Sequence, residues 1–138
     1  MRSPATNEGS QMPTAAEMVA EAKKRVQNLT VDETAAELES GDVLLVDIRE
    51  PGEREQTGVI PGAVEAPRGM LEFWADPTSP YHREEFQPDR RVILQCASGG
   101  RSALAAAMLQ EMGYANVAHL DGGMNAWKEQ GRPVIDGA

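Results

Sequence analysis

The one stretch whose residue types suit nucleophilic chemistry is 95–102, which holds the only cysteine of the chain. Cys96 follows the apolar run 92–94, and the alanine-rich run 102–112 follows the stretch. The thiolate is the reactive form of cysteine, and helix N-termini and nearby cations lower the pKa of a thiol. A turn between a strand and a helix supplies free N–H groups, and Arg101 supplies a positive charge. The stretch therefore predicts a sulfur nucleophile held as an anion.

The turn after the cysteine is suited to surround that anion with N–H groups. The expected cradle and substrate-binding residues are Ala97, Ser98, Gly99, Gly100, Arg101 and Ser102. Its two glycines allow positive φ values, and its two serines add hydroxyl groups. The same ring would hold the outer sulfur of a persulfide on Cys96. Because the sequence has no second thiol, that sulfur would pass to an external acceptor by double displacement.

Composition limits the classes of partner. The 138 residues, 41% hydrophobic and 25% charged, suffice for one domain with a core. The net charge of −9 argues against nucleic acid and against an anionic membrane. His82 and His119 stand apart, so no metal-ligand spacing is present and no metal is expected. No signal-peptide pattern opens the chain, no run approaches the ~20 apolar residues of a membrane span, and a free thiol favours a cytoplasmic location.

Strand-like and helix-like runs alternate along the chain. Residues 43–46 and 92–94 are continuous apolar runs typical of strands buried on both faces of a parallel sheet, the second strand reaching residue 95, and 116–120 is the last expected strand. The alternation predicts an α/β fold whose sheet is covered on both faces through right-handed crossovers. Ligands bind at the carboxyl ends of the strands in such folds, and Asp47 and Cys96 each follow a strand.

The expected boundaries follow from composition and capping signals. They are a flexible tail over 1–13, an N-terminal helix over 14–28, the main domain over 29–133 and a C-terminal tail over 134–138. Thr14 and Glu17 form the capping-box pattern that begins the helix. Residues 75–90 are the longest irregular stretch, a length often linked to function or mobility. Whether this loop or His82 lines the site stays open.

Four sequence blocks resemble the single-domain rhodaneses, a family of sulfurtransferases. They are residues 46–51, 58–63, 96–102 and 120–127, in the family's order. The resemblance implies a doubly wound α/β domain with a five-stranded parallel core flanked by helices, here with an extra N-terminal helix. It also implies transfer of sulfane sulfur from thiosulfate or a persulfide donor to cyanide or a thiol. The intermediate would be a persulfide on Cys96, with no other cofactor, and the acceptor could be a protein.

The resemblance also assigns supporting residues. Asp47 and Arg49 match the family's acidic and basic pair near the site, which organises the site rather than reacting. Read from the residues alone, the two could equally be a plain structural ion pair. The family's usual histidine in the second block is Val59 here, and we take that histidine to be mainly structural.

The cysteine turn differs from that of many family members in having no basic residue directly after the cysteine. Rhodaneses that bind thiosulfate well often carry basic residues where Ala97 and Ser98 stand. A sulfonate would instead be held by one of three arginines, Arg49, Arg68 or Arg101. Thiosulfate would then be a surrogate for a persulfide donor.

Two other functions remain open. Some rhodanese-like domains are non-catalytic docking or regulatory modules, although such modules commonly lack the cysteine. Cell-cycle phosphatases and related arsenate reductases share the fold but place five residues between cysteine and arginine. Here four residues separate Cys96 from Arg101. Because a smaller ring fits a sulfur atom better than a phosphate, the residue count favours sulfur transfer.

Overall fold

The structure is a computed structural model that describes residues 12–137. The expected tail over 1–13 therefore lies, up to residue 11, outside the described residues. The strands are β1 (Gln27–Leu29), β2 (Leu44–Asp47), β3 (Val64–Glu65), β4 (Val92–Gln95) and β5 (Val117–Leu120). The helices are α1 (Ala15–Arg25), α2 (Val31–Ser40), α3 (Pro51–Thr57), α4 (Leu71–Ala75), α5 (Gly100–Glu111) and α6 (Gly123–Glu129), with a 3-10 turn η1 (Arg68–Met70) before α4.

The five strands form one parallel sheet in the order β1-β5-β4-β2-β3, which confirms the expected α/β core. Every residue of β2, β4 and β5 is buried, as the continuous apolar runs predict. Asp47 pairs with Gln95, so β2 and β4 end side by side. Cys96 is the next residue after β4. The sheet therefore brings the predicted nucleophile and the predicted acidic residue to the same edge.

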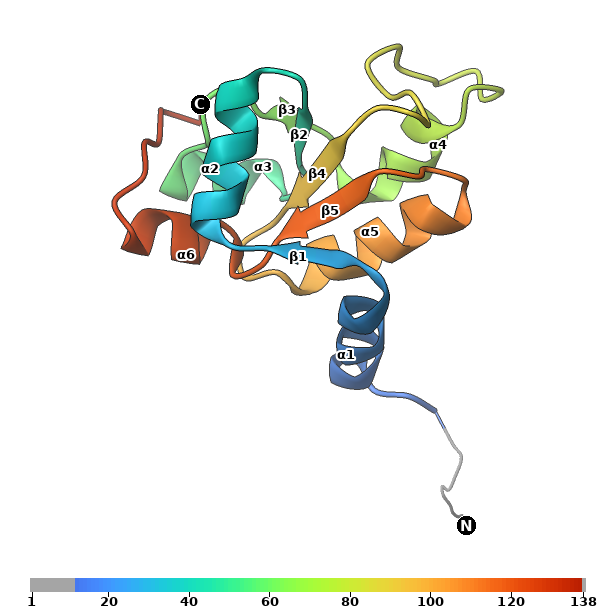
Figure 1. Ribbon diagram of the computed structural model, residues 1–138, viewed down its shortest axis with the longest axis horizontal. Helices are drawn as coiled ribbons and strands as arrows, with labels where there is room; N and C mark the ends of the chain where they lie inside the picture. Colours follow the sequence, from blue (N-terminus) through green and yellow to red (C-terminus); the bar gives the residue numbers. More distant parts are fainter. Residues whose placement is uncertain (1–11, 138) are drawn as a thin grey trace.

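Helices cover both faces of the sheet, and each face has its own core (Figure 1). One core contains α1, α4 and α5 side chains, and the other contains α2 and α6 side chains such as Ala35 and Trp127. Four alanines of α5, between Ala103 and Ala107, are buried. Small side chains let α5 lie close to the sheet, which brings its N-terminus near the end of β4.

The N-terminal helix is shorter than expected. Its capping box of Thr14 and Glu17 is present, but the helix ends at Arg25 rather than at 28. Residues 27–29 instead form β1, which pairs in parallel with β5. The pairing of β1 depends on β5, a strand almost a hundred residues further along the chain. The helical spacing of residues before 27 therefore does not show where the helix ends. The pairing sets Asn28 opposite His119.

The last described residues return to the domain instead of forming a tail. Val59 and Ile135 form an antiparallel bridge with two N–H to carbonyl bonds of 2.8 and 2.9 Å. Val134 packs against the core that contains Trp127. The valine that replaces the family histidine thus lies where the chain end joins the domain. In the described part of the chain, no helix has the length and apolar character to cross a membrane.

Candidate active site

Cys96 lies at the carboxyl end of β4 with its side chain buried. Its Sγ accepts hydrogen bonds from the N–H groups of Gly99, at 3.2 Å, and Ser102, at 3.4 Å. Ser102 is in the first turn of α5, where backbone N–H groups lack intrahelical partners. Gly99 has a φ of 105°, which glycine adopts without steric cost. The turn therefore directs backbone donors at the sulfur, as a thiolate or persulfide anion requires.

The first turn of α6 fixes the orientation of this turn. The N–H groups of Met124 and Asn125 donate to the carbonyls of Cys96, at 2.9 Å, and Ala97, at 3.0 Å. Because these carbonyls face α6, the following N–H groups can face the sulfur. Gly123 is packed against the same carbonyls, and an added Cβ would lie 2.6 Å from the carbonyl carbon of Ala97. The sequence block at 120–127 was recognised as a family signature, but this anchoring role is visible only in the structure.

Replacing Gly123 with alanine is therefore expected to disturb both the fold and the cradle. The φ of 58° and the overlap with the 96–97 backbone together should cost about 1–3 kcal/mol of folding free energy. Gly131→Ala is the matched control, since Gly131 has a similar positive φ of 74° but nothing lies within 4 Å of its added Cβ. Urea unfolding of both variants measures the difference. Equal costs would contradict the close approach of α6 to the turn.

The Arg101 side chain is held by a carboxylate that sequence reasoning missed. Its two terminal nitrogens donate to the two carboxylate oxygens of Glu53 on α3, both at 2.8 Å. This bond is the main cause that lowers the pKa of Glu53 to about 2. Glu53 and, more weakly, the negative charge of Cys96 raise the pKa of Arg101. The guanidinium is thus near enough to the cysteine to feel its charge, but its main partner is Glu53.

The depressed pKa of Glu53 makes a pH-dependent contribution to stability. A carboxyl group whose pKa falls from 4.5 to about 2 on folding stabilises the protein above pH 4.5, and loses this contribution as pH falls toward 2. Glu53→Gln is expected to be less stable than wild type at neutral pH, with the gap closing across that window. Urea unfolding at several pH values measures it. Glu55→Gln, at an exposed position of the same helix, is the control, and a gap that persists at the acid end would contradict the assignment.

Asp47 and Arg49 form a buried ion pair at the end of β2, with an Oδ2 to Nη2 distance of 2.9 Å. Arg49 also donates to the hydroxyl of Thr57 and to the carbonyl of Gly58, each at 2.7 Å. The pair therefore ties β2 to the end of α3, the helix that carries Glu53. The hydrogen bonds between Asp47 and Arg49 do not reach Cys96.

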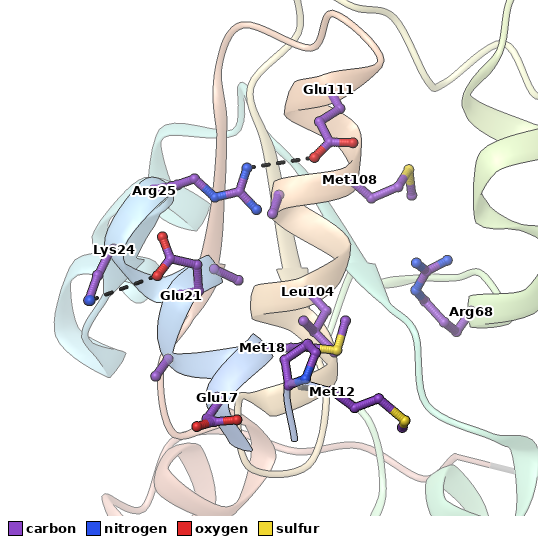
Figure 2. A pocket seen from close by; sticks show the side chains of 14 residues that line it. Met12, Glu17, Met18, Glu21, Lys24, Arg25, Arg68, Leu104, Met108 and Glu111 are labelled. Atoms are coloured by element: carbon purple, nitrogen blue, oxygen red, sulfur yellow. Dashed lines mark ion pairs between the residues drawn. The ribbon is translucent and has the colours of Figure 1, made fainter. Parts of the chain in front are cut away.

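Arg68 has a different setting from the one expected. Its guanidinium donates to Glu72 at 2.9 Å, and the side chain lines a groove of about 930 Å³ between α1 and α5 (Figure 2). Met18 and Met108 face the same groove. Of the described residues that line it, none belongs to the 96–102 turn. The structure thus groups Arg68 with the α1–α5 surface rather than with the cradle.

The two histidines have unlike settings. His82 lies in the loop after α4 and its Nε2 is 3.0 Å from the carbonyl of Phe86, a contact internal to that loop. His119 on β5 is fully buried, and its Nδ1 is 2.8 Å from the hydroxyl of Ser102. From the sequence, His119 could be either structural or merely exposed, because a strand residue can point to either face. Only the sheet register and the packing of α5 bring it to the cysteine turn.

The pKa of Cys96 is lowered from its ordinary value. Burial is the largest single influence and acts in the opposite direction, to raise it. Hydrogen bonds to the Ser102 side chain and to the N–H groups of Ser102, Gly99 and Ser98 together outweigh burial. The turn therefore favours the thiolate, which is the nucleophilic form.

Fold and site together define a single-domain parallel α/β protein with one cysteine in an anion-binding turn at the carboxyl edge of its sheet. The family model for the rhodanese-like domain matches residues 30–130, and the chain belongs to this family. A sulfurtransferase from Allochromatium vinosum is 42% identical over 94 residues, which are 68% of this chain and 79% of that protein.

Two solved structures show the same fold. A protein of unknown function from Rhodopseudomonas palustris, described as a possible tyrosine phosphatase, has a TM-score of 0.85 and 44% identity over 91% of this chain and 97% of its own. The polysulfide-sulfur transferase homodimer from Wolinella succinogenes has a TM-score of 0.70 and 29% identity, covering 86% of this chain and 84% of its own. The chain thus belongs to the rhodanese-like family, which includes proteins named sulfurtransferases.

Proposed function

We propose that the protein carries sulfane sulfur as a persulfide on Cys96. The observation that supports this most directly is the set of backbone N–H groups on Sγ, from Gly99 and Ser102. The thiolate attacks the sulfane sulfur of the donor, a new S–S bond forms, and the donor's own bond to that sulfur breaks. An acceptor thiolate then attacks the outer sulfur and Cys96 leaves as thiolate. The electron count balances without any group beyond the cysteine.

The donor that fits the turn best is a persulfide or polysulfide. Ala97 and Ser98 contribute no positive charge. Both terminal nitrogens of the Arg101 guanidinium already donate to Glu53. A sulfonate would therefore compete with that carboxylate for the guanidinium. The relative from Wolinella succinogenes is a polysulfide-sulfur transferase, which agrees with this donor class. Thiosulfate is then a surrogate donor, and the acceptor is a thiol, of a small molecule or a protein, in a reducing cytoplasmic setting.

Phosphatase chemistry is the second candidate, because the relative from Rhodopseudomonas palustris is described as a possible tyrosine phosphatase. The turn argues against it. Four residues between Cys96 and Arg101 make a smaller ring than five would, and a tetrahedral phosphate needs more room than one sulfur atom. A docking module without turnover is the third candidate, and it would leave the lowered pKa of Cys96 unused.

Donor-dependent loading of the free thiol tests the proposal. Purified protein is mixed separately with thiosulfate, inorganic polysulfide and a glutathione persulfide, and its intact mass is measured. The expected result is a gain of one sulfur atom, fastest with the persulfide or polysulfide, that is lost again on adding cyanide or a thiol. No gain from any of the three donors would overturn the sulfurtransferase proposal. Hydrolysis of an aryl phosphate by the same protein would favour the phosphatase candidate instead.

A further inference from the structure

A chain of buried polar side chains leads away from the sulfur into the protein. Cys96 Sγ is 3.5 Å from the hydroxyl oxygen of Ser102, which is 2.8 Å from Nδ1 of His119. Nε2 of His119 is 2.7 Å from Oδ1 of Asn28. The four residues come from the end of β4 and from α5, β5 and β1. A cysteine needs backbone donors to be a stable thiolate, but it does not need a histidine two contacts away, so the chain calls for an explanation.

The orientation of Asn28 determines which imidazole nitrogen carries a hydrogen. Its Nδ2 donates to the carbonyls of Lys23, at 2.9 Å, and Val26, at 3.2 Å, so Oδ1 is the amide atom that faces His119. An amide oxygen only accepts, and Nε2 of the imidazole must therefore donate. In the neutral ring Nδ1 is then an acceptor, and its partner is the hydroxyl proton of Ser102.

A hydroxyl group has one proton to donate. While Ser102 donates to His119, its oxygen can only accept from the Cys96 thiol. If Ser102 turns its hydrogen to a Cys96 thiolate, Nδ1 of a neutral His119 loses its donor. Both contacts are kept when Nδ1 has taken up a proton of its own and donates it to the Ser102 oxygen. Thiolate formation with the hydroxyl as donor is thus linked to proton uptake at the imidazole.

We propose that Ser102 and His119 form a proton relay for Cys96, with Asn28 as the positioning residue that holds the imidazole in the receptive tautomer. The Cys96 S–H bond breaks as an O–H bond forms on Ser102, whose own O–H breaks as an N–H bond forms on Nδ1. Serine is regenerated, no atom is oxidised, and the proton stays inside the protein. The role of the relay in catalysis rests on the proposed function. The relay itself concerns only the deprotonation of the Cys96 thiol before any donor binds.

The charges around His119 set how readily it takes the proton. Burial is the main cause that lowers its pKa to about 4, so the resting imidazole is neutral. It takes the thiol proton only where the negative charge left on Cys96 offsets this effect of burial. Asp121, after β5, raises that pKa and Lys23, on α1, lowers it. These two form an ion pair of 3.0 Å with each other. From β4 the facing group is Cys96, whose negative charge after transfer favours the imidazolium, while β1 presents the neutral Asn28.

Alkylation of Cys96 by iodoacetamide, followed across pH without any sulfur donor, tests the relay. His119→Asn keeps an amide that can bond to Ser102 but cannot take a proton. Its alkylation is expected to be roughly 100-fold slower than wild type at neutral pH, with the deficit closing at alkaline pH where hydroxide removes the thiol proton. A deficit that is constant across pH, or none at all, would overturn the relay.

A surface variant that is expected to speed alkylation, rather than slow it, distinguishes the relay from a folding defect. Lys23→Gln leaves Asp121 unneutralised, so His119 becomes more basic and alkylation at neutral pH is expected to be roughly twofold to fivefold faster. Lys24→Gln, one residue along α1 and paired with Glu21, is the control and should match wild type. No increase for Lys23→Gln would contradict the relay. Because no donor is used, a protein that shows both alkylation effects but never gains sulfur would retain the relay and refute only the sulfur-transfer proposal.

Discussion

Cys96→Ser is expected to abolish sulfur loading and turnover while leaving the fold intact. Serine oxygen forms no stable bond to a sulfane sulfur under these conditions, and the sequence offers no other thiol that could replace Cys96. The backbone donors of Gly99 and Ser102 remain, because they depend on the turn and not on the sulfur. Intact mass after incubation with polysulfide, together with a urea unfolding curve, measures both parts of the expectation.

Wild-type protein alkylated at Cys96 is the chemical counterpart of this variant and should behave in the same way. A mass gain of one sulfur atom in Cys96→Ser would place the sulfur elsewhere and contradict the persulfide assignment. Loss of the cooperative unfolding transition would instead show that the cysteine is needed for the fold. A partner that binds wild type and Cys96→Ser equally, in the absence of any turnover, would support the docking-module alternative.

Asp47→Ala is expected to lower the free energy of unfolding by about 3–5 kcal/mol. The carboxylate is fully buried and makes three hydrogen bonds to the Arg49 side chain at 2.9 to 3.3 Å. Its removal leaves a guanidinium that is 1% exposed without its counter-charge. A buried charge that loses its partner costs far more than the pair contributed, because no water replaces the lost carboxylate. Urea unfolding at neutral pH measures the loss.

Asp32→Ala is the matched control. Asp32 also pairs with an arginine, Arg132, at 2.9 Å, but its side chain is 79% exposed, so the expected cost is below about 1 kcal/mol. A double variant, Asp47→Ala with Arg49→Met, should cost less than the sum of the single changes, since it removes the stranded charge. Strict additivity would contradict a buried, coupled pair. The remaining cost would reflect the carbonyl of Gly58, which loses the Arg49 donor.

The parallel α/β fold could be predicted because its signals are local. The apolar runs at 43–46 and 92–94 became parts of β2 and β4, and the capping pattern at Thr14 became the start of α1. The expected helix end at 28 was wrong, because residues 27–29 pair with a strand that lies far along the chain. The expected tail from 134 was wrong for a similar reason, since Ile135 bridges to Val59.

By itself the sequence identified the family and predicted the candidate nucleophile and its turn. A single cysteine between a strand and a helix, with glycines and Arg101 at fixed spacing, encodes the cradle within one short segment. Such a segment forms through backbone geometry and the N-terminus of its own helix, so residue order is sufficient to predict it.

Only the tertiary structure decided which distant side chains serve that turn. Glu53 holds Arg101 from α3, Gly123 lets α6 bind the turn carbonyls, and His119 meets Ser102 through the sheet. It also placed Arg68 beside Glu72 and the α1–α5 groove. These contacts depend on strand order, register and helix packing, which arise from burial summed over the whole domain and leave no short-range pattern in the sequence.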